Sequence, residues 1–326
     1  MEISVVIATY KREKDLQDAL LSLLRQSEAP HEVVVIDDSS ENETEELVRS
    51  YQDEFKKQGT TFIYFRNTRA RSLTVARNIG SSKTSGDIIL FIDDDVELAP
   101  NYLSEIRSFY ESHPKAVGAQ GTTINDLPIT GRNNAFRAFF ALTHYRYDRR
   151  VRVLSSTEEV LPYNQDHPFV CERLAGSNQS YRRMVFNYFH FDEALLRWAC
   201  KEDLDFSYRV HKRFTDRLFC VPTARLVHKT SMEARMTNYA RIKMCNVYSF
   251  YLFFKNMPHD FGSFTVLLRS QLGKFLFCLG KSFSSRDARA TTYFLKSIGI
   301  VLRHLRDLEE LKMDEVNREL GLQEGQ

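Results

Sequence analysis

The stretch at residues 86–97 constrains the fold more than any other, because an apolar run leads directly into three successive aspartates. Residues 88–92 are all apolar, and Asp93, Asp94 and Asp95 follow them. Such a run predicts a strand that is buried on both faces, as in the parallel sheet of an α/β protein. Adjacent carboxylates at its end repel one another, so we expect a cation or the donors of a ligand to offset that repulsion. A solvated acidic turn is the alternative interpretation.

The spacing of these aspartates favours a hard cation. Side chains two residues apart point to the same side of an extended chain, so Asp93 and Asp95 would face one ligand together. Carboxylate oxygens are ligands that suit Mg²⁺ or Mn²⁺. The sequence therefore predicts a Mg²⁺ or Mn²⁺ site at the end of this strand.

Predicted strands and helices alternate through the first hundred residues. Buried strands are expected at residues 3–8, 33–36 and 61–65, and helical apolar spacing occupies the segments between strands. This alternation predicts an α/β fold with a doubly wound, mostly parallel sheet. Ligands of such sheets bind at the carboxyl ends of the strands, where Tyr10 and Asp38 also lie. The alternatives are a half-buried aromatic side chain for Tyr10 and a helix-capping turn for Asp38.

The first turn of the chain lacks the glycines that other nucleotide-binding proteins use. No glycine precedes Gly59, so residues 9–13 cannot form a dinucleotide fingerprint or a P-loop. This excludes dehydrogenases and P-loop kinases, and it disfavours sugar-nucleotide pyrophosphorylases. A diphosphate in this site would need the cation and arginines such as Arg77 to offset its charge.

Acidic residues recur where a later helix is expected to begin. Periodicity is lost at residues 122–175, where no element is predicted and which we expect to wall the substrate pocket. Glu202 and Asp203 then open a predicted helix, whose dipole stabilises carboxylates at its N-terminus. Acidic capping is the alternative interpretation of these two residues.

A histidine ends the last strand expected in this part of the chain. Short strands are predicted at residues 219–221 and 225–227, and His228 follows the second. A ligand role for His228 stands against the alternative of a structural histidine at a strand end.

Several short motifs occur together and in order. They are Ala8-Thr9-Tyr10, Asp37-Asp38, Ala76-Arg77-Asn78-x-Gly80, Gly86-Asp87, Phe91-x-Asp93-Asp94-Asp95, Gly176-x-Asn178, Phe191-Asp192-Glu193, Glu202-Asp203-x-Asp205 and Val227-His228. Over about residues 1–235 this pattern resembles the family-two glycosyltransferases of the GT-A fold. The chain departs from the family pattern at Ser39, at Gln179 and at Cys200-Lys201, and these departures leave the donor sugar and the acceptor open.

The resemblance implies a GT-A catalytic domain at residues 1–235 and a role for each motif residue. It implies nucleotide contacts by Ala8, Tyr10, Arg12, Asp38, Arg77, Asp93 and Asp94, a metal site of Asp93, Asp95 and His228, and catalysis by Asp203 with Glu202 beside it. The implied reaction is a metal-dependent, inverting transfer of a hexose-type sugar from a nucleotide-diphosphate donor to a hydroxyl group. We expect a UDP-sugar as donor and a lipid-linked acceptor or a glycan.

Two other functions share parts of this pattern. A non-catalytic nucleotide-sugar binding module would keep the fold, but it would need neither the metal carboxylates nor the base. A sugar-nucleotide nucleotidyltransferase would need the glycine-rich loop that is absent here. No nucleic-acid partner is expected.

The C-terminal region at residues 236–326 is predicted to consist of amphipathic helices. Between Ala234 and Arg306 there are 12 Lys or Arg residues and two acids, a net charge of +10 within a chain of net charge +2. Two apolar stripes have helical spacing. The first is Leu268, Leu272, Phe275 and Leu279, and the second is Phe294, Ile298, Val301, Leu305 and Leu308. Apolar stripes with this charge predict docking on an anionic membrane surface, and core packing is the alternative.

The distribution of cysteines and apolar residues suggests a location. Five dispersed cysteines without a C-x-x-C pair argue against a disulfide framework or a zinc knuckle and favour the cytosol. The apolar run at the N-terminus is too short for a signal peptide. Arg269, Lys274 and Lys281 interrupt the most apolar C-terminal stretch, so no transmembrane helix is expected. We therefore expect a peripheral enzyme on the cytoplasmic face of a membrane.

Overall fold

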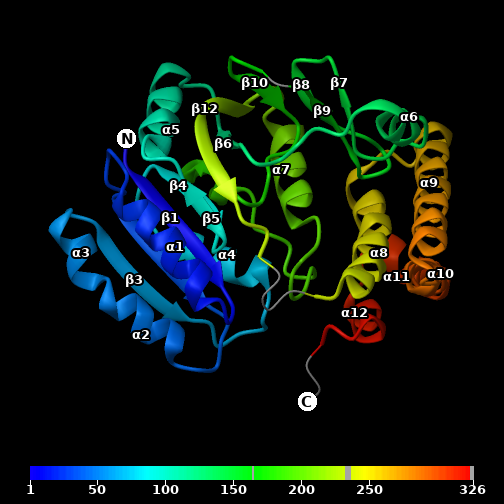
Figure 1. Cartoon of the computed structure of the whole chain (residues 1–326), viewed down its shortest axis with the longest axis horizontal. Helices are drawn as coiled ribbons and strands as arrows, with labels where there is room; N and C mark the ends of the chain where they lie inside the picture. Colours follow the sequence, from blue (N-terminus) through cyan, green and yellow to red (C-terminus); the bar gives the residue numbers. More distant parts are fainter. Residues whose placement is uncertain (164, 232–235, 324–326) are drawn as a thin grey trace.

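Four parallel strands form the first half of the sheet in the computed structural model, which describes residues 1–163, 165–231 and 236–323 (Figure 1). They are β1 (Ile3–Thr9), β2 (Glu32–Asp37), β3 (Thr61–Arg66) and β4 (Ile88–Asp93), in the spatial order β3-β2-β1-β4. All three pairings are parallel. Continuous apolar runs make up most of these strands because helices cover both faces of the sheet. The predicted doubly wound, mostly parallel sheet is confirmed.

Helices cover the two faces of these strands. α1 (Glu13–Leu24) and α5 (Tyr102–Ser112) pack on the face that carries Val5 and Ile7 of β1. α4 (Leu73–Lys83) packs on the other face, where a Cβ atom on Gly80 would lie 2.3 Å from Val6 Cγ1. α2 (Glu43–Ser50) and α3 (Gln52–Lys57) complete the first half of the chain.

The second half of the sheet mixes strand directions. β11 (Gln179–Arg182) lies antiparallel between β4 and β6 (Gly118–Thr123). β12 (Leu218–His228) pairs in parallel with β6 and antiparallel with β5 (Val96–Leu98). The prediction of two separate short strands was wrong, because β12 continues through a register shift between Cys220 and Arg225.

Residues 122–175 contain short elements that no periodicity could reveal. They are α6 (Gly131–Phe139), β7 (His144–Arg146), β8 (Arg150–Val153), β9 (Glu159–Pro162) and β10 (Phe169–Cys171). Strands of three or four residues are too short to display an alternating pattern. β10 pairs with β12, so this segment extends the central sheet. The 3₁₀ helix η1 (Arg183–Asn187) and then α7 (Glu202–Arg213) follow β11.

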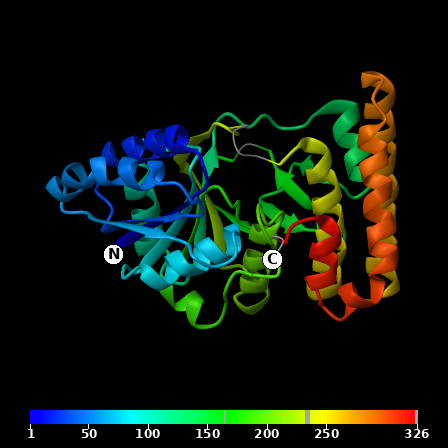
Figure 2. The same cartoon turned by 90° about the horizontal axis from the view of Figure 1, so that it is seen from below.

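The C-terminal helices form a separate layer beyond α7. They are α8 (Asn238–Asn256), α9 (Phe261–Ser285), α10 (Arg289–Arg303), α11 (Leu305–Glu309) and α12 (Asp314–Leu320). Figure 2 shows α9 and α10 at the edge of the molecule farthest from β3. Among the described helices, none has the length and apolar character needed to cross a membrane. The predicted domain boundary at residue 235 lies outside the described residues.

A disulfide bond joins this layer to the residues just before α7. Cys200, which directly precedes Lys201 and α7, is bonded to Cys245 of α8. The expectation that the cysteines form no disulfide is therefore wrong for this pair, since the fold brings together two residues that sequence spacing does not relate. Cys171, Cys220 and Cys278 are free and buried.

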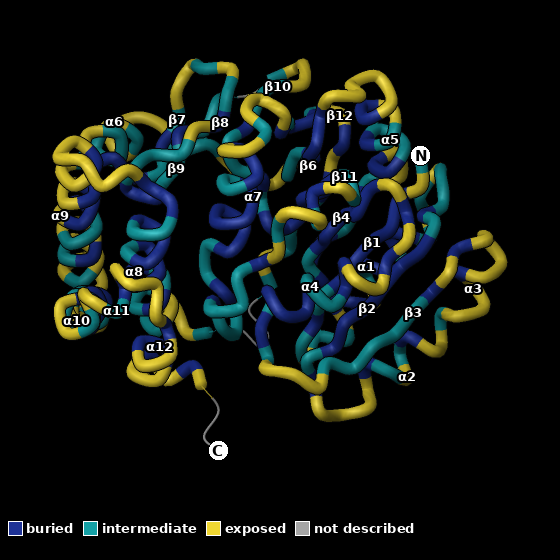
Figure 3. Tube along the Cα trace, turned by 180° about the vertical axis from the view of Figure 1, so that it is seen from behind, coloured by how far each residue is buried: buried dark blue, intermediate teal, exposed yellow. Residues whose placement is uncertain are grey.

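The two apolar stripes of the C-terminal region have different surroundings. In the second stripe, Phe294, Val301 and Leu308 are buried, so this stripe belongs to the core of the helical layer. In the first, Leu268 and Leu272 are 65% and 52% exposed. Figure 3 shows exposed positions repeating along α9. Phe275 of the first stripe packs against the buried cluster that contains Phe294, whereas Leu305 of the second stripe is exposed. The core interpretation therefore holds for most of the second stripe and for only part of the first.

Ion pairs reduce the free charge of this region. The ammonium group of Lys274 is largely buried and is paired with a carboxylate, since its Nζ atom lies 3.0 Å from Glu158 Oε1. Arg306 pairs with Glu310, which lies outside the segment whose charge was counted. Arg269 and Lys281 remain exposed. The segment's effective positive charge is therefore smaller than its composition implies.

Candidate active site

The residues that the sequence singled out line a single cavity of about 720 Å³. These are Ala8, Tyr10, Arg12, Asp38, Arg77, Asp93, Asp94, Asp95, Glu202, Asp203 and His228. The cavity lies at the carboxyl ends of β1, β2 and β4, because parallel strands bring these ends to one edge of the sheet. Its other wall comes from residues that precede and begin α7.

Asp93, Asp95 and His228 form a cluster whose ligand atoms lie within 4.8 Å of one another. The pairing of β5 with β12 sets His228 opposite Val96, directly after Asp95. Two carboxylates and an imidazole at this spacing fit one divalent cation. Asp95 is 1% exposed, and the hydrogen bond that it accepts from the Ser231 N–H is 3.0 Å long. This donor fixes the orientation of the carboxylate.

Asp94 points away from this cluster. Thr9 Oγ1 donates a 2.8 Å hydrogen bond to Asp94 Oδ2, and Arg12 Nη1 lies 2.9 Å from Asp94 Oδ1. Burial raises the pKa of Asp94 to about 7, although the Arg12 guanidinium opposes the rise. These contacts join the turn after β1 to the end of β4. Asp94 and Arg12 therefore hold each other in place at the wall of the pocket.

Tyr10 and Asp38 lie in the part of the cavity formed by β1 and β2. The Arg71 guanidinium lies over the Tyr10 ring, 4.1 Å from its centroid, and it also faces the Trp198 ring at 5.3 Å. Asp38 accepts a 2.7 Å hydrogen bond from Asn67 Nδ2. Burial raises the pKa of Asp38 to about 6, while Asn67 and Arg71 act in the opposite direction. An aromatic ring beside a carboxylate can contact the face and the N–H donors of a nucleobase.

Arg77 connects the two ends of the site. It is 2% exposed, pairs with Glu202, and lies 3.0 Å from Asp93 Oδ1. Its Nη2 also donates a 2.8 Å hydrogen bond to the carbonyl of Gly176. The guanidinium therefore fixes the candidate metal cluster relative to the start of α7, and it contacts protein carboxylates directly.

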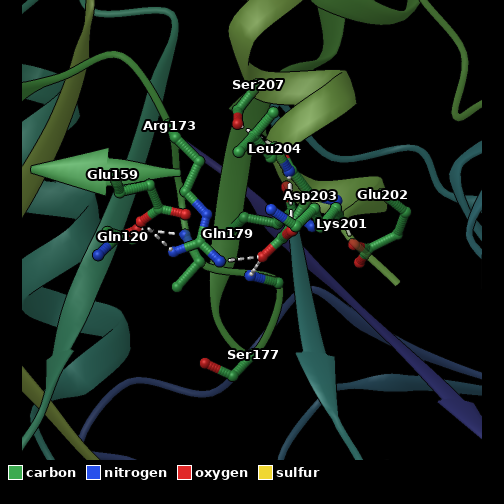
Figure 4. A network of polar contacts seen from close by, with 12 residues as sticks. Gln120, Glu159, Arg173, Ser177, Gln179, Lys201, Glu202, Asp203, Leu204 and Ser207 are labelled. Carbon is green, nitrogen blue, oxygen red and sulfur yellow. Dashed lines mark hydrogen bonds and ion pairs between the residues drawn. The ribbon is translucent and has the colours of Figure 1, made fainter. Parts of the chain in front are cut away.

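Asp203 is held at the N-terminus of α7 by several donors (Figure 4). Its Oδ2 accepts a 2.9 Å hydrogen bond from the Gly176 N–H, and its Oδ1 accepts one of 2.7 Å from the Leu204 N–H. Arg173 pairs with the same carboxylate. Burial alone would raise the pKa of Asp203, but Arg173 and the two N–H groups outweigh it and hold the pKa below its usual value.

Glu202 has the opposite electrostatic environment. Its Oε2 accepts a hydrogen bond from the Asp203 N–H, and both carboxylates lie beside Gly176. Burial and the neighbouring charge of Asp203 raise the pKa of Glu202 well above its usual value, and the Arg77 guanidinium opposes them. Adjacent carboxyl groups with pKa values moved apart are suited to different roles, and the ionised one is the better proton acceptor. Asp203 is the ionised member of this pair.

Several charged or aromatic residues of the site were not predicted individually from the sequence. Arg71, Trp198, Glu159 and Arg173 are among them, and all four line the cavity. Each lies outside the predicted elements or in a short strand. Clusters of arginine and carboxylate at non-periodic positions carry no local signal, so the fold was needed to find them.

Comparison with known proteins gives a family-model match to residues 4–158, described as "Glycosyl transferase family 2". Glucosyl-dolichyl phosphate glucuronosyltransferase of Haloferax volcanii is 30% identical over 128 residues, which are 39% of each chain. GalNAc(5)-diNAcBac-PP-undecaprenol beta-1,3-glucosyltransferase of Campylobacter jejuni is 30% identical over 106 residues, 32% of this chain and 33% of that protein. The matched region thus spans about a third of these relatives.

Solved structures show the same fold across nearly the whole chain. S. aureus TarS 1-349 superposes with a TM-score of 0.53 at 17% identity, covering 98% of this chain and 92% of that one. Mannosyltransferase PcManGT from Pyrobaculum calidifontis, in complex with GDP-Man and Mn²⁺, gives a TM-score of 0.54 at 13% identity, with 99% and 88% coverage. The predicted GT-A fold is confirmed.

Proposed function

We propose that this chain, whose residues 4–158 match the model of glycosyl transferase family 2, transfers a sugar from a nucleoside-diphosphate donor to an acceptor hydroxyl group with inversion. The observation that carries the proposal is that one cavity contains both the Asp93–Asp95–His228 cluster and Asp203. The cluster suits the diphosphate end of a donor, and a carboxylate across the cavity suits an acceptor.

The donor site is proposed to combine a cation with the pocket around Tyr10. Asp93, Asp95 and His228 would hold Mg²⁺ or Mn²⁺, which would offset the charge of the departing nucleoside diphosphate. Tyr10 would contact the face of the base and Asp38 its N–H donors. TarS, which shares this fold, has been solved in complex with UDP-GlcNAc, and we therefore propose a UDP-sugar as donor.

Asp203 is proposed to act as general base. It would accept the proton of the acceptor hydroxyl while the acceptor oxygen forms its bond to the anomeric carbon. The bond from that carbon to the diphosphate oxygen breaks in the same step, and the nucleoside diphosphate leaves with the electron pair. The low pKa of Asp203 keeps it ionised before the reaction. A positioned base supplies about 10²–10⁴ in rate.

A donor assay distinguishes this function from the two alternatives. The protein is incubated with a panel of sugar nucleotides and Mn²⁺, and the released nucleotide is identified. A transferase releases nucleoside diphosphate, a nucleotidyltransferase exchanges pyrophosphate, and a binding module does neither. Pyrophosphate exchange, or donor binding with no release in the presence of any acceptor tested, would contradict the proposal.

We further propose that the acceptor is lipid-linked or a glycan at a membrane surface, and that α9 docks there. The apolar side chains that α9 exposes are Phe261, Phe264, Leu268, Leu272, Leu276, Phe277 and Phe283. Its buried positions are Leu267 and Cys278 together with Ser263, Ser270, Gln271 and Gly273. A helix in water normally exposes few large apolar side chains, so this exposed apolar face supports an apolar environment outside α9.

Charge favours an anionic membrane surface as that environment. Arg269 and Lys281 are exposed on α9, and Lys296 is exposed on α10. Each cation close to an anionic leaflet contributes about 1 kcal/mol of attraction. The named acceptor classes of the Haloferax and Campylobacter relatives, a dolichyl phosphate and an undecaprenol diphosphate glycan, also support a substrate at a membrane. We do not propose the cytoplasmic face that the cysteine distribution suggested, because the Cys200–Cys245 bond is of a kind that persists in oxidising compartments.

A further inference from the structure

Arg173 lies between two carboxylates that come from distant parts of the chain. Its guanidinium pairs with Asp203 at the start of α7, and its Nη1 lies 3.4 Å from Glu159 Oε2 at the start of β9. Figure 4 shows the side chain of Arg173 extending toward Asp203, with Glu159 beside the guanidinium. The segment at residues 122–175 thus reaches the candidate base through one arginine.

The carboxylate of Asp203 is fixed from several directions. The N–H groups of Gly176 and Leu204 each donate to one of its oxygens, at 2.9 and 2.7 Å. Both donors belong to the backbone, so they set the position of the carboxylate but cannot adjust to its charge. Arg173 adds the side-chain cation of this set. A charge-assisted contact of this kind is about twice as strong as a neutral hydrogen bond.

Glu159 in turn is held in a rigid setting. The neighbouring Glu158 is paired with Lys201 at 2.9 Å and with Lys274 of α9 at 3.0 Å. Lys201 directly precedes α7, so the start of β9 is tied both to the catalytic helix and to the outer helical layer. Because Glu159 directly follows the anchored Glu158, its carboxylate can hold the Arg173 guanidinium in one position. A residue that supports a catalytic group must be held in this way.

We propose that Arg173, held by Glu159, is a positioning residue that fixes the Asp203 carboxylate for removal of the acceptor proton. The inference rests on the proposed role of Asp203 as base. Arg173 is 22% exposed at its side chain and lines the same cavity as Asp203. Misplacing a catalytic group by about 1 Å can cost about 10²-fold in rate.

The charged groups that face Asp203 set the pH dependence expected of its variants. Arg173 holds the pKa of Asp203 low, whereas burial raises it; Glu202 adjoins it, and Glu159 lies behind Arg173. Arg77 of α4 also faces Asp203. Removing the Arg173 guanidinium takes away the largest effect that opposes burial, while Arg77 and the two N–H donors remain, so the pKa of Asp203 should rise. The acidic limb of the kcat profile should then move to higher pH, because the base must be ionised.

The test compares Arg173→Gln, Arg173→Lys and Glu159→Gln with a matched control. The control is Arg150→Gln. Arg150 lies in the same segment, residues 122–175, and the substitution breaks its 3.1 Å pair with Asp216. We expect Arg173→Gln to lower kcat by about 10–100-fold and to shift the acidic limb upward, with the donor KM unchanged. Arg173→Lys should restore part of kcat, Glu159→Gln should cause a smaller loss, and the control should match the parent.

Two outcomes overturn the inference separately from the proposed function. An Arg173→Gln variant with the parent's kcat and pH profile would remove Arg173 from any positioning role, even if Asp203→Asn is inactive. A further loss of at least 10-fold when Arg173→Gln is added to Asp203→Asn would show that the arginine acts independently of the base. If Asp203→Asn retains full activity, the proposed role of Asp203 as base fails first, and with it the premise of this inference. Thermal unfolding of each variant shows whether it folds. If Arg173→Gln does not fold, the kcat and pH profiles of Arg173→Lys and Glu159→Gln decide the question.

Discussion

The Nε2 atom of His228 lies 3.0 Å from Oδ1 of Asp95. The contact exists because the antiparallel pairing of β5 with β12 sets His228 opposite Val96. A histidine and a carboxylate that come from distant parts of the sequence thereby meet at the end of β4. The register of one short strand thus determines whether a third ligand stands beside the two aspartates.

The carboxylates at the start of α7 give the first prediction. Asp203→Asn should lower kcat by about 10²–10⁴ and leave the donor KM near that of the parent, because an amide cannot accept the acceptor proton. Glu202→Gln should affect kcat less, since burial and Asp203 raise the pKa of Glu202 and favour its protonated form. Steady-state kinetics with saturating donor measures both. The reverse order of effects would transfer the role of base to Glu202.

Asp38 gives a prediction that links binding to stability. Burial raises its pKa from 3.8 to about 6 in the folded protein. Between about pH 4 and pH 6 the unfolded chain has lost this proton and the folded chain retains it, so folding stability falls as the pH rises through this window. Asp38→Asn should therefore stabilise the protein at pH 8 by up to about 3 kcal/mol.

The same substitution should weaken nucleotide binding, because an ionised carboxylate accepts stronger hydrogen bonds than an amide does. Denaturant unfolding at pH 4 and pH 8, together with nucleotide titration at pH 8, measures both effects. The gain in stability should be absent at pH 4. An equal change at the two pH values would show that ionisation of Asp38 is not its cause.

The exposed face of α9 predicts binding to lipid vesicles. Leu268→Gln combined with Leu272→Gln should abolish flotation with anionic vesicles and leave thermal stability unchanged, because these side chains are 65% and 52% exposed. Leu127→Gln is the matched control, since Leu127 is 85% exposed but lies outside α9. The parent protein should float at low salt and release at high salt.

The docking proposal fails if the parent does not float, or if the double variant floats equally well. A concentration-dependent dimer that the double variant loses would identify a second copy of the chain, and not a membrane, as the occupant of this face.

The Cys200–Cys245 bond predicts a stability that depends on reduction. The two residues are separated by 45 positions, and closing a loop of that length stabilises the folded state by about 4 kcal/mol in the chain-entropy view. A reducing agent should lower the Tm of the parent and leave that of Cys200→Ser unchanged. Unequal responses of this kind would contradict the cytoplasmic location expected from the sequence, because such bonds persist in oxidising compartments.

Local sequence patterns predicted those site residues that lie directly at the end of a strand or at the start of a helix. Asp93 and Asp95 follow an apolar run, and Asp203 opens a helix, so their positions depend on near neighbours in the chain. His228 was identified as a candidate, but its place beside Asp95 depends on the register between β5 and β12, which no local pattern encodes. Arg173 could not be predicted, since it follows a three-residue strand.

The outer helices show a second limit of sequence reasoning. Both apolar stripes have the same spacing, yet Leu268 is exposed and Val301 is buried. Which stripe enters the core depends on how α8, α9 and α10 pack, and therefore on tertiary contacts. Lys274 illustrates the same point, because its pairing with Glu158 removes from the surface a charge that composition alone assigns to it.

Transfer by the Asp95→Asn variant tests the central claim most directly. The asparagine keeps the size of the side chain and an oxygen for the Ser231 N–H, but it removes the charge that a cation requires. Glu97→Gln is the matched control, because Glu97 lies two residues further along the chain, in β5, and pairs with Lys229. Release of nucleoside diphosphate from a sugar-nucleotide donor, measured across a Mn²⁺ titration, should be Mn²⁺-dependent in the parent and in Glu97→Gln. It should fall at least 100-fold in Asp95→Asn, an effect of the size that removing a single stabilising group at a transition state produces. Mn²⁺-dependent release by Asp95→Asn at the parent's rate would contradict the account.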